Sequence, residues 1–262
     1  MAHSPKYNCL LLAGDRGPDD PVARATGATR KALAGVGGQQ MIARVLGVLA
    51  ECPMIGTVTI VANNVDEIQC GITASAVGGA VRWCEGGTSP ASSVMVAQAN
   101  DSSEYPVLIV TADNPLLTGA RLGLFLAAAD ELDCDVAVGL AQKSDIAHAY
   151  PKMKRTFVNL KGEGFSGCNL FLLKSPQALA AVQFWTGIEA SRKKALRMVA
   201  AFGIATLLKV LLGKLDLFGA LERVSNVVDA RIAPVILDAE ASIDVDRADH
   251  IPLVESILRT RT

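Results

Sequence analysis

The sequence predicts an α/β fold built on a doubly wound, mostly parallel sheet of Rossmann-like type. Strand-like and helix-like segments alternate from residue 6 to residue 140. Half of the 262 residues are hydrophobic and 19% are charged, so the chain can bury a large core. Aromatic residues are 5% of the chain, and small and aliphatic residues dominate. Such a composition suits buried parallel strands that helices cover on both faces.

Short apolar or β-branched runs mark the expected strands. Residues 7–13 (YNCLLLA) are apolar and end before a glycine, as a buried strand does. The other strands of the first part are expected at residues 57–62, 80–83, 105–111 and 134–140. In the less regular second part, strands are expected at residues 157–160, 168–173 and 235–237, the first two flanking a turn at 161–164.

Apolar residues at helical spacing and capping residues mark the expected helices. Residues 41–51 (MIARVLGVLAE) show this spacing. Ser92 is expected to cap a helix that ends at Asn100, and Thr118 opens one that ends at Leu132. Residues 14–30, rich in Gly, Asp, Pro and Arg, are expected to form a polar loop. Further helical segments are expected at residues 65–75, 175–222 and 252–259.

No internal repeat and no Pro- or Ser-rich linker interrupts the chain. We therefore expect one continuous domain over residues 1–262, with a regular half at 6–140 and a less regular half at 141–262. Six scattered cysteines form no C-x-x-C pair and indicate no zinc site.

Charge and hydropathy limit the kinds of partner. The net charge of -1 and the pI of 6.3 come without the basic stripe of a nucleic-acid-binding protein. The first six residues lack the apolar segment of a signal peptide, so we expect a cytoplasmic protein without a transmembrane segment. The most apolar window, residues 195–221, is broken by charges before the ~18 uncharged residues of a membrane span. We expect it to pack in the core, with membrane-surface contact as the alternative.

The first expected strand runs into a basic loop. Glycine at position 14 lets the backbone approach a ligand closely, and the backbone N–H groups of such a turn can hold phosphate oxygens. Arginine and lysine side chains add the charge that a triphosphate needs. The loop matches neither the Walker A pattern nor G-x-G-x-x-G. An ordinary loop with solvated basic side chains is the alternative. The basic residues are Arg16, Arg24, Arg30 and Lys31.

Three short stretches resemble the signature of the GT-A-type nucleotidyltransferases, the MobA-like NTP transferase family, which runs L-A-G-G-x-G-x-R-M, then K-x-L, then G-x-P-M-[IL]. Relatives include molybdenum cofactor guanylyltransferase and methylerythritol phosphate cytidylyltransferase. The resemblance implies a GT-A fold with a catalytic Lys31 and a catalytic Arg16. Because other residues replace the family's G-x-G-x-R part in this chain, Arg24 is the alternative to Arg16. It also implies nucleotide binding by Leu12, Ala13, Gly14 and Asp15. The stretches are residues 12–14, 31–33 and 37–42.

Asp113 follows an apolar strand directly, in the stretch TADNPLL. A charge there is costly unless it lies in a cleft or is paired. Such a carboxylate suits Mg²⁺, which takes protein and triphosphate oxygens together. A turn or cap residue is the alternative. The stretch resembles the family's T-A-D-x-P-L-[LI], which implies that Asp113 is both catalytic and a metal ligand.

Asp244 and Asp246 are two residues apart on an extended segment and therefore share a face. They could complete a metal site with Asp113, whereas a solvated loop with a capping aspartate is the alternative. The segment resembles the family's closing [DN]-[IV]-[DN]-T-P-E-D-L. This resemblance implies that both side chains lie near the metal and the product phosphates, Asp246 first.

Residues 86–94 (GGTSPASSV) precede an expected helix. They resemble the cytidylyltransferase pattern G-G-x-x-R-x-x-S-V, with Pro90 in place of the Arg. The resemblance implies that Gly87 and Ser93 contact the nucleotide and favours CTP, with GTP left open. A capped helix after a turn is the alternative.

The acceptor side is expected in the second half of the chain. Lys152, Lys154 and Arg155 form a basic stretch suited to an acceptor phosphate, with a solvated surface hairpin as the alternative. In sugar-phosphate relatives an Asn near the position of Asn169 contacts the acceptor.

The expected activity is Mg²⁺-dependent transfer of a nucleoside monophosphate from CTP or GTP to a phosphorylated small-molecule acceptor, with release of pyrophosphate. Residues 6–140 would form the nucleotide-binding half, and 141–262 the acceptor side and the closing metal segment. A homodimer is the default expectation. Two alternatives stay open, a regulatory module that binds nucleotide without catalysis, and a GT-A glycosyltransferase that uses a sugar nucleotide.

Overall fold

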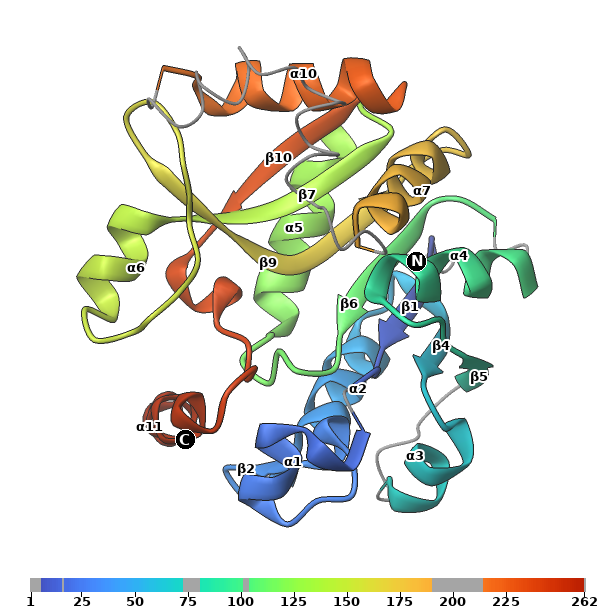
Figure 1. Cartoon of the computed structure of the whole chain (residues 1–262), viewed down its shortest axis with the longest axis vertical. Helices are drawn as coiled ribbons and strands as arrows, with labels where there is room; N and C mark the ends of the chain where they lie inside the picture. The colour runs from blue at the N-terminus through green and yellow to red at the C-terminus, as the bar shows by residue number, and fades with distance from the viewer. Residues whose placement is uncertain (1–5, 16, 73–80, 101–103, 190–213, 262) are drawn as a thin grey trace. The chain divides into compact units, whose positions relative to one another are not determined.

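The computed structural model describes residues 6–15, 17–72, 81–100, 104–189 and 214–261 (Figure 1). Its contacts group the chain into two compact units. The first unit combines Met1–Leu124 with Ile243–Thr262, and the second is Phe125–Ser242. The expectation of a single domain stays a prediction.

Four parallel strands form the sheet of the first unit, in the order β6-β1-β4-β5. Their apolar side chains are buried, and Tyr7, Leu10, Leu11, Ile60 and Leu108 are among the most completely buried. The predicted runs are therefore strands, with ends that differ by one or two residues from the expectation. The strands are β1 (Tyr7–Leu12), β4 (Ile55–Ala62), β5 (Val81–Glu85) and β6 (Val107–Thr111).

The strand order explains why helices cover both faces of this sheet. The chain steps outward from β1 to β4 to β5, and then returns past β1 to β6. Because parallel crossovers are right-handed, α2 (Met41–Glu51) and α3 (Val65–Gly71) lie on one face and α4 (Pro90–Asn100) lies on the other. This arrangement confirms the predicted doubly wound topology. Ligands of such sheets bind at the carboxyl ends of the strands.

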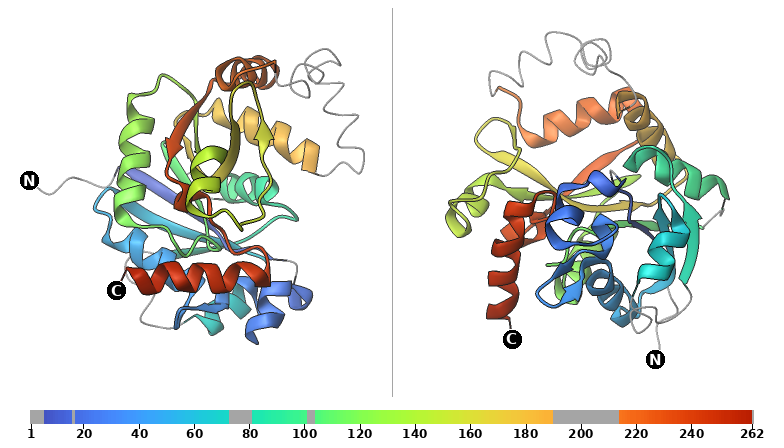
Figure 2. Two further views of the ribbon diagram at one scale, coloured as in Figure 1. Left: turned by 90° about the vertical axis from the view of Figure 1, so that its left-hand side faces the viewer. Right: turned by 60° about the horizontal axis from the view of Figure 1, so that its bottom comes forward.

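The first unit also contains short elements around this sheet. A small hairpin of β2 and β3 precedes α2, and α11 runs beside it (Figure 2). The helix α5 begins in this unit, and the Thr118 hydroxyl caps it by accepting a hydrogen bond from Arg121 N at 3.2 Å, as predicted. The bounds are β2 (Gly35–Val36), β3 (Gln39–Gln40), α5 (Gly119–Glu131) and α11 (Ile251–Thr260), with 3-10 helices at Gly17–Asp19, Lys31–Leu33 and Ala248–His250.

Two local expectations were wrong. Residues 14–30 are not wholly a loop, because they contain the helix α1 (Pro21–Thr26). Asp20 caps it by accepting from Val22 N at 2.9 Å, and Gly27 ends it with φ of 71°. Helix α4 begins at Pro90, before Ser92, whose backbone N donates to the Ser89 hydroxyl at 3.2 Å. A proline suits a first helical turn because its missing N–H has no partner there.

The second unit contains a mixed sheet. β10 pairs with β7 in parallel, whereas β9 pairs with β7 and β8 in antiparallel fashion. The predicted turn at residues 161–164 does connect two strands, and Gly162 adopts φ of 86° within it. The strands are β7 (Val136–Gln142), β8 (Val158–Asn159), β9 (Gly164–Leu173) and β10 (Ile232–Leu237). The helices are α6 (Lys143–Ala149), α7 (Ala178–Glu189) and α10 (Leu217–Val228), with a 3-10 helix at Ala239–Ser242.

The helical region expected at 175–222 is confirmed only at its two ends, by α7 and the start of α10. Most of the apolar window at 195–221 lies outside the described residues, so its packing and its membrane contact are untested. None of the helices described is long and apolar enough to span a bilayer.

Candidate active site

The ends of β1 and β6 lie side by side at the carboxyl edge of the first unit's sheet. Leu12 pairs with Thr111, and Ala112 N donates to Leu12 O at 2.9 Å. On the other side of β1, Ala13 N donates to Val61 O at 2.8 Å. The loop after residue 13 and the segment after residue 111 therefore leave the sheet at one place.

A third segment joins them from near the end of the chain. Val245 N donates to Asp113 O at 2.8 Å, which fixes residues 243–246 against the segment after β6. Asp244 is 6% exposed, and the buried His250 ring contacts Asp244 O through Nδ1 at 2.9 Å. This contact brings Asp246 beside Asp113, which precedes it by more than a hundred positions in the sequence.

Lys31 lies between two of these carboxylates. Its Nζ donates to Asp113 Oδ2 at 2.5 Å and to Asp246 Oδ1 at 2.6 Å. Lys31 is 9% exposed, although it carries a charge. We call Lys31, Asp113 and Asp246 the lysine–carboxylate cluster. The three predicted residues are thus brought together by the fold.

Burial and charge act against each other in this cluster. Burial disfavours the charged ammonium, but Asp113 and Asp246 outweigh it and raise the pKa of Lys31, which is therefore a cation at neutral pH. Burial is also the largest influence on Asp113 and raises the pKa of its carboxyl group. Lys31 opposes that shift, whereas Asp244 adds to it. The Thr111 hydroxyl also donates to Asp113 Oδ1 at 2.5 Å.

The donor set of the cluster fits a magnesium ion that arrives with phosphate ligands. Asp113 and Asp246 both direct an oxygen at one cationic atom. Within the described ranges, no group of three or more His, Cys, Asp or Glu side chains is arranged to hold a metal by itself. Mg²⁺ in phosphoryl-transfer sites typically uses one or two carboxylates plus substrate phosphates. Two convergent carboxylates meet that requirement.

Asp15 is tied to the loop that precedes Lys31. Its Oδ2 accepts from Lys31 N at 2.9 Å, and its Oδ1 accepts from Gly17 N at 2.7 Å. Arg30 donates to Asp15 Oδ1 at 3.2 Å and to Glu67 Oε2 at 2.7 Å. The Asp15 carboxylate therefore sets the path of the loop, and its predicted nucleotide contact stays a prediction. The bracing role of Arg30 was missed, because its partner Glu67 is 37 positions away.

The two arginine candidates for phosphate binding are placed differently. Arg16 lies outside the described residues. Arg24 lies on α1 with a side chain that is 70% exposed, 4.0 Å from Asp19. This exposure leaves the Arg24 guanidinium accessible to a ligand.

The glycine-rich segment before α4 is held closely against the helix. Ser93 Oγ accepts from Gly87 N at 3.0 Å, and Ser93 is 7% exposed. A Cβ on Gly87 would lie 2.4 Å from Ser92 Oγ and 2.8 Å from the Ser92 carbonyl carbon, so only glycine fits. Ser93 therefore shapes this loop, and base recognition by Gly87 and Ser93 stays a prediction.

Asn63 was missed by the sequence reasoning. It follows β4, and its Oδ1 lies 3.3 Å from the position of a Cβ on Gly14 and equally far from one on Gly86. The loop after β1 and the loop before α4 thus approach the same side chain. The sequence does contain a signal that could have identified Asn63. An amide residue directly follows a buried strand there, at the edge of the sheet where ligands bind.

The proposed acceptor residues lie in the second unit. Arg155 donates from Nε to Ser166 Oγ at 2.8 Å and from Nη2 to Gly167 O at 3.1 Å. Asn169 lies within β9 and adopts φ of 54°, near a register irregularity of that strand. Lys152 and Lys154 are exposed. Acceptor binding by Arg155 and Asn169 stays a prediction.

Known proteins are similar to this chain in sequence and in fold. The family model described as the MobA-like NTP transferase domain matches residues 9–232. No protein with curated function matches the sequence. A solved hypothetical transferase from Thermus thermophilus shares 24% identity with a TM-score of 0.76, covering 94% of this chain and 99% of that one.

Two further solved structures share the fold at lower identity. The 4-diphosphocytidyl-2C-methyl-D-erythritol synthase of Anaerococcus prevotii is 11% identical with a TM-score of 0.61, and 97% of this chain and 96% of that chain are covered. A CMP:2-keto-3-deoxy-manno-octonic acid synthetase complexed with CTP is 12% identical with a TM-score of 0.59, with coverage of 99% and 100%.

Proposed function

Because the chain belongs to the MobA-like NTP transferase family, we propose that it transfers a nucleoside monophosphate from a nucleoside triphosphate to a phosphorylated small-molecule acceptor. Membership makes it a nucleotidyltransferase, and the choice of nucleotide, acceptor and metal is our proposal. The observation that carries it is the lysine–carboxylate cluster at the carboxyl ends of β1 and β6. A cation between two carboxylates at this edge suits a site that handles phosphate charge.

The proposed reaction needs positioning more than proton transfer. An oxygen of the acceptor phosphate attacks the α-phosphorus of the triphosphate, and the bond from that phosphorus to the bridging oxygen of the β-phosphate breaks. Pyrophosphate leaves with the bonding electrons. Since the attacking phosphate is already ionised, no general base is required, and catalysis rests on alignment and on charge stabilisation.

The residues of the first unit divide this work. Lys31 is a buried cation whose pKa is raised, so it can hold the charge that develops on phosphate oxygens. Backbone N–H groups of the loop after β1, which begins at Gly14, would approach the phosphates. Asp113 and Asp246 would hold Mg²⁺, and when bound that ion neutralises phosphate charge. The arginine partner would be Arg16 or Arg24.

The nucleotide is proposed to be CTP or GTP. The segment from Gly87 to Ser93 resembles the cytidylyltransferase pattern, and one structural neighbour is named as a complex with CTP. Arg155 and Asn169 are the proposed acceptor contacts, since Arg155 presents a guanidinium that can pair with a phosphate.

The test is pyrophosphate release by the full chain with CTP, GTP, UTP and ATP, each with Mg²⁺ and a panel of phosphorylated sugars and alcohols. We expect one triphosphate to support turnover, and Asp113→Asn to lower it by at least a hundredfold while the circular dichroism spectrum is kept. Arg82→Ala, an exposed change on β5, is the matched control and should keep the rate. Full activity of Asp113→Asn, or no release with any pair, would overturn the proposal.

A further inference from the structure

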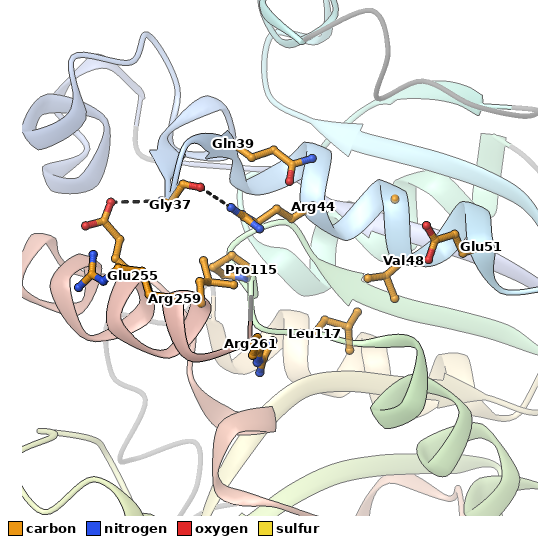
Figure 3. Close-up of a pocket in the computed structure, with 12 residues that line it drawn as sticks. Gly37, Gln39, Arg44, Val48, Glu51, Pro115, Leu117, Glu255, Arg259 and Arg261 are labelled. Atoms are coloured by element: carbon orange, nitrogen blue, oxygen red, sulfur yellow. Dashed lines mark hydrogen bonds between the residues drawn. The ribbon is translucent and has the colours of Figure 1, made fainter.

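A hollow in the first unit contains no member of the lysine–carboxylate cluster. Its walls come from α2, the turn between β2 and β3, residues 115–117 and α11 (Figure 3). Its volume is about 470 Å³, within the range of sites that bind small molecules. Figure 3 shows charged side chains of α2 and α11 around it.

Arg44 is held in this wall by backbone groups. It donates from Nε to Val36 O at 3.1 Å and from Nη2 to Gly37 O at 2.6 Å. No ion pair with a described carboxylate is formed by Arg44. Gly37 has φ of 59°, which favours glycine, and a Cβ there would crowd the guanidinium at 3.1 Å from Arg44 Nη2. The Arg44 guanidinium is thus positioned in advance.

A second guanidinium lies close to the first. Burial is the main cause that lowers the pKa of Arg44, and the positive charge of Arg261 lowers it further. Arg261 donates from Nη1 to Leu116 O at 3.2 Å, so it too contacts a backbone carbonyl. Arg259 on α11 also lines the hollow. Like charges at short range repel, and a bound anion would remove that repulsion.

The two carboxylates that line the hollow do not neutralise the positive charge of Arg44. Glu255 accepts from Gly37 N at 3.1 Å through Oε1 and so braces the turn (Figure 3). Glu51 lines the hollow from the exposed end of α2. Neither forms an ion pair with Arg44 in the described structure. Three arginines against two glutamates leave a net positive charge.

We propose that this hollow binds a phosphate-bearing anion, separately from the catalytic nucleotide site. A phosphate group carries more than one negative charge near neutral pH and offers several acceptor oxygens, which suits more than one planar guanidinium. A monocarboxylate offers one charge, and the two glutamates already present would offset much of its attraction. The occupant is therefore inorganic phosphate, pyrophosphate or a small molecule with such a group.

The test is titration calorimetry of the full chain with inorganic phosphate and with pyrophosphate, without metal or nucleotide. We expect saturable binding of at least one of them. Arg261→Glu places a carboxylate beside Arg44, so binding should fall at least tenfold while the melting temperature is kept or raised. Arg44→Lys keeps the charge but loses the planar fork, and should also weaken binding. Arg82→Glu makes the same charge change on exposed β5 and is the control.

Lys31→Met separates this site from the catalytic one and should keep the binding. No saturable binding of either anion by the intact chain would overturn the proposal. Binding that is lost in Lys31→Met and kept in both arginine variants would overturn it as well, since the anion would then occupy the lysine–carboxylate cluster. If Lys31→Met does not fold, the two arginine variants still decide the question.

Discussion

The Lys31 Nζ lies 2.5 Å from Asp113 Oδ2, although 82 residues separate the two in sequence. The same nitrogen contacts Asp246 Oδ1 at 2.6 Å. The ammonium therefore neutralises the two carboxylates that we propose as metal ligands. A metal ion alone must compete with Lys31 for them, whereas a metal–triphosphate complex offers phosphate oxygens as new partners for the ammonium.

Lys31→Met should therefore strengthen the binding of metal alone. Removing the cation takes a charged partner away from Asp113 and Asp246, which raises their affinity for a divalent ion. Because the Asp113 side chain is only 18% exposed, the same change destabilises the fold. We expect Mn²⁺ without nucleotide to bind at least tenfold more tightly than in the intact chain, as measured by electron paramagnetic resonance. Mn²⁺ should also raise the melting temperature of the variant more than that of the parent. Equal Mn²⁺ affinity in the two proteins would contradict this competition.

Arg30→Met should destabilise the loop before Lys31. The Arg30 and Asp15 side chains are 7% and 1% exposed, so removing the guanidinium leaves a buried carboxylate without its charged partner. We expect a loss of about 3–5 kcal/mol in the free energy of unfolding. Urea denaturation measures it, and Arg24→Met, with a 70% exposed side chain, is the control expected to change stability by less than ~0.5 kcal/mol. Similar values for the two variants would refute the bracing role of Arg30.

Gly87→Ala should distort the segment before α4. The new Cβ would lie 2.8 Å from the Ser92 carbonyl carbon, which is backbone and cannot move aside easily. We expect a loss of about 1–3 kcal/mol, measured by thermal or chemical denaturation. Gly123→Ala on α5 is the matched control, because nothing lies within 4 Å of its added Cβ, and it should stabilise the helix by up to ~1 kcal/mol. A neutral Gly87→Ala would show that the segment can shift.

Asp135 should make the stability of the second unit depend on pH. Burial alone would raise its pKa, but hydrogen bonds from Arg231 N at 2.8 Å and Ser175 Oγ at 2.8 Å outweigh burial and lower it. A lowered pKa in the folded state stabilises the fold above the unfolded pKa of ~3.9, and this contribution is lost as pH falls through the folded value.

Asp135→Asn should therefore cost about 1–3 kcal/mol at pH 7, and the difference from the parent should shrink toward zero in strong acid. Urea denaturation at several pH values measures both. Asp133→Asn is the control, since Asp133 is 90% exposed and its pair with Arg231 contributes little. A difference that stays constant down to pH 2 would rule out the linkage.

Local patterns in the sequence predicted most of the elements for a clear reason. In α2, the buried residues Met41, Ile42, Val45, Leu46 and Leu49 follow the helical period, so the pattern alone defined residues 41–51 as a helix. Helix α1 was not predicted, because it has only six residues and two buried side chains, Val22 and Ala23. Its cap at Asp20 could be recognised only after the helix itself was known.

The sequence by itself determined the family and the alternation of strands and helices. It also singled out Lys31, Asp113 and Asp246 as candidate site residues, because each lies in a short motif next to a strand or helix. Only the tertiary structure decided that these three meet, that Arg30 braces Asp15, and that Arg44 and Arg261 lie in one hollow. The physical reason is distance along the chain. Strand order and crossovers bring together groups that are far apart in the sequence, such as Lys31 and Asp246 at a separation of 215 positions, and no local pattern encodes such a contact.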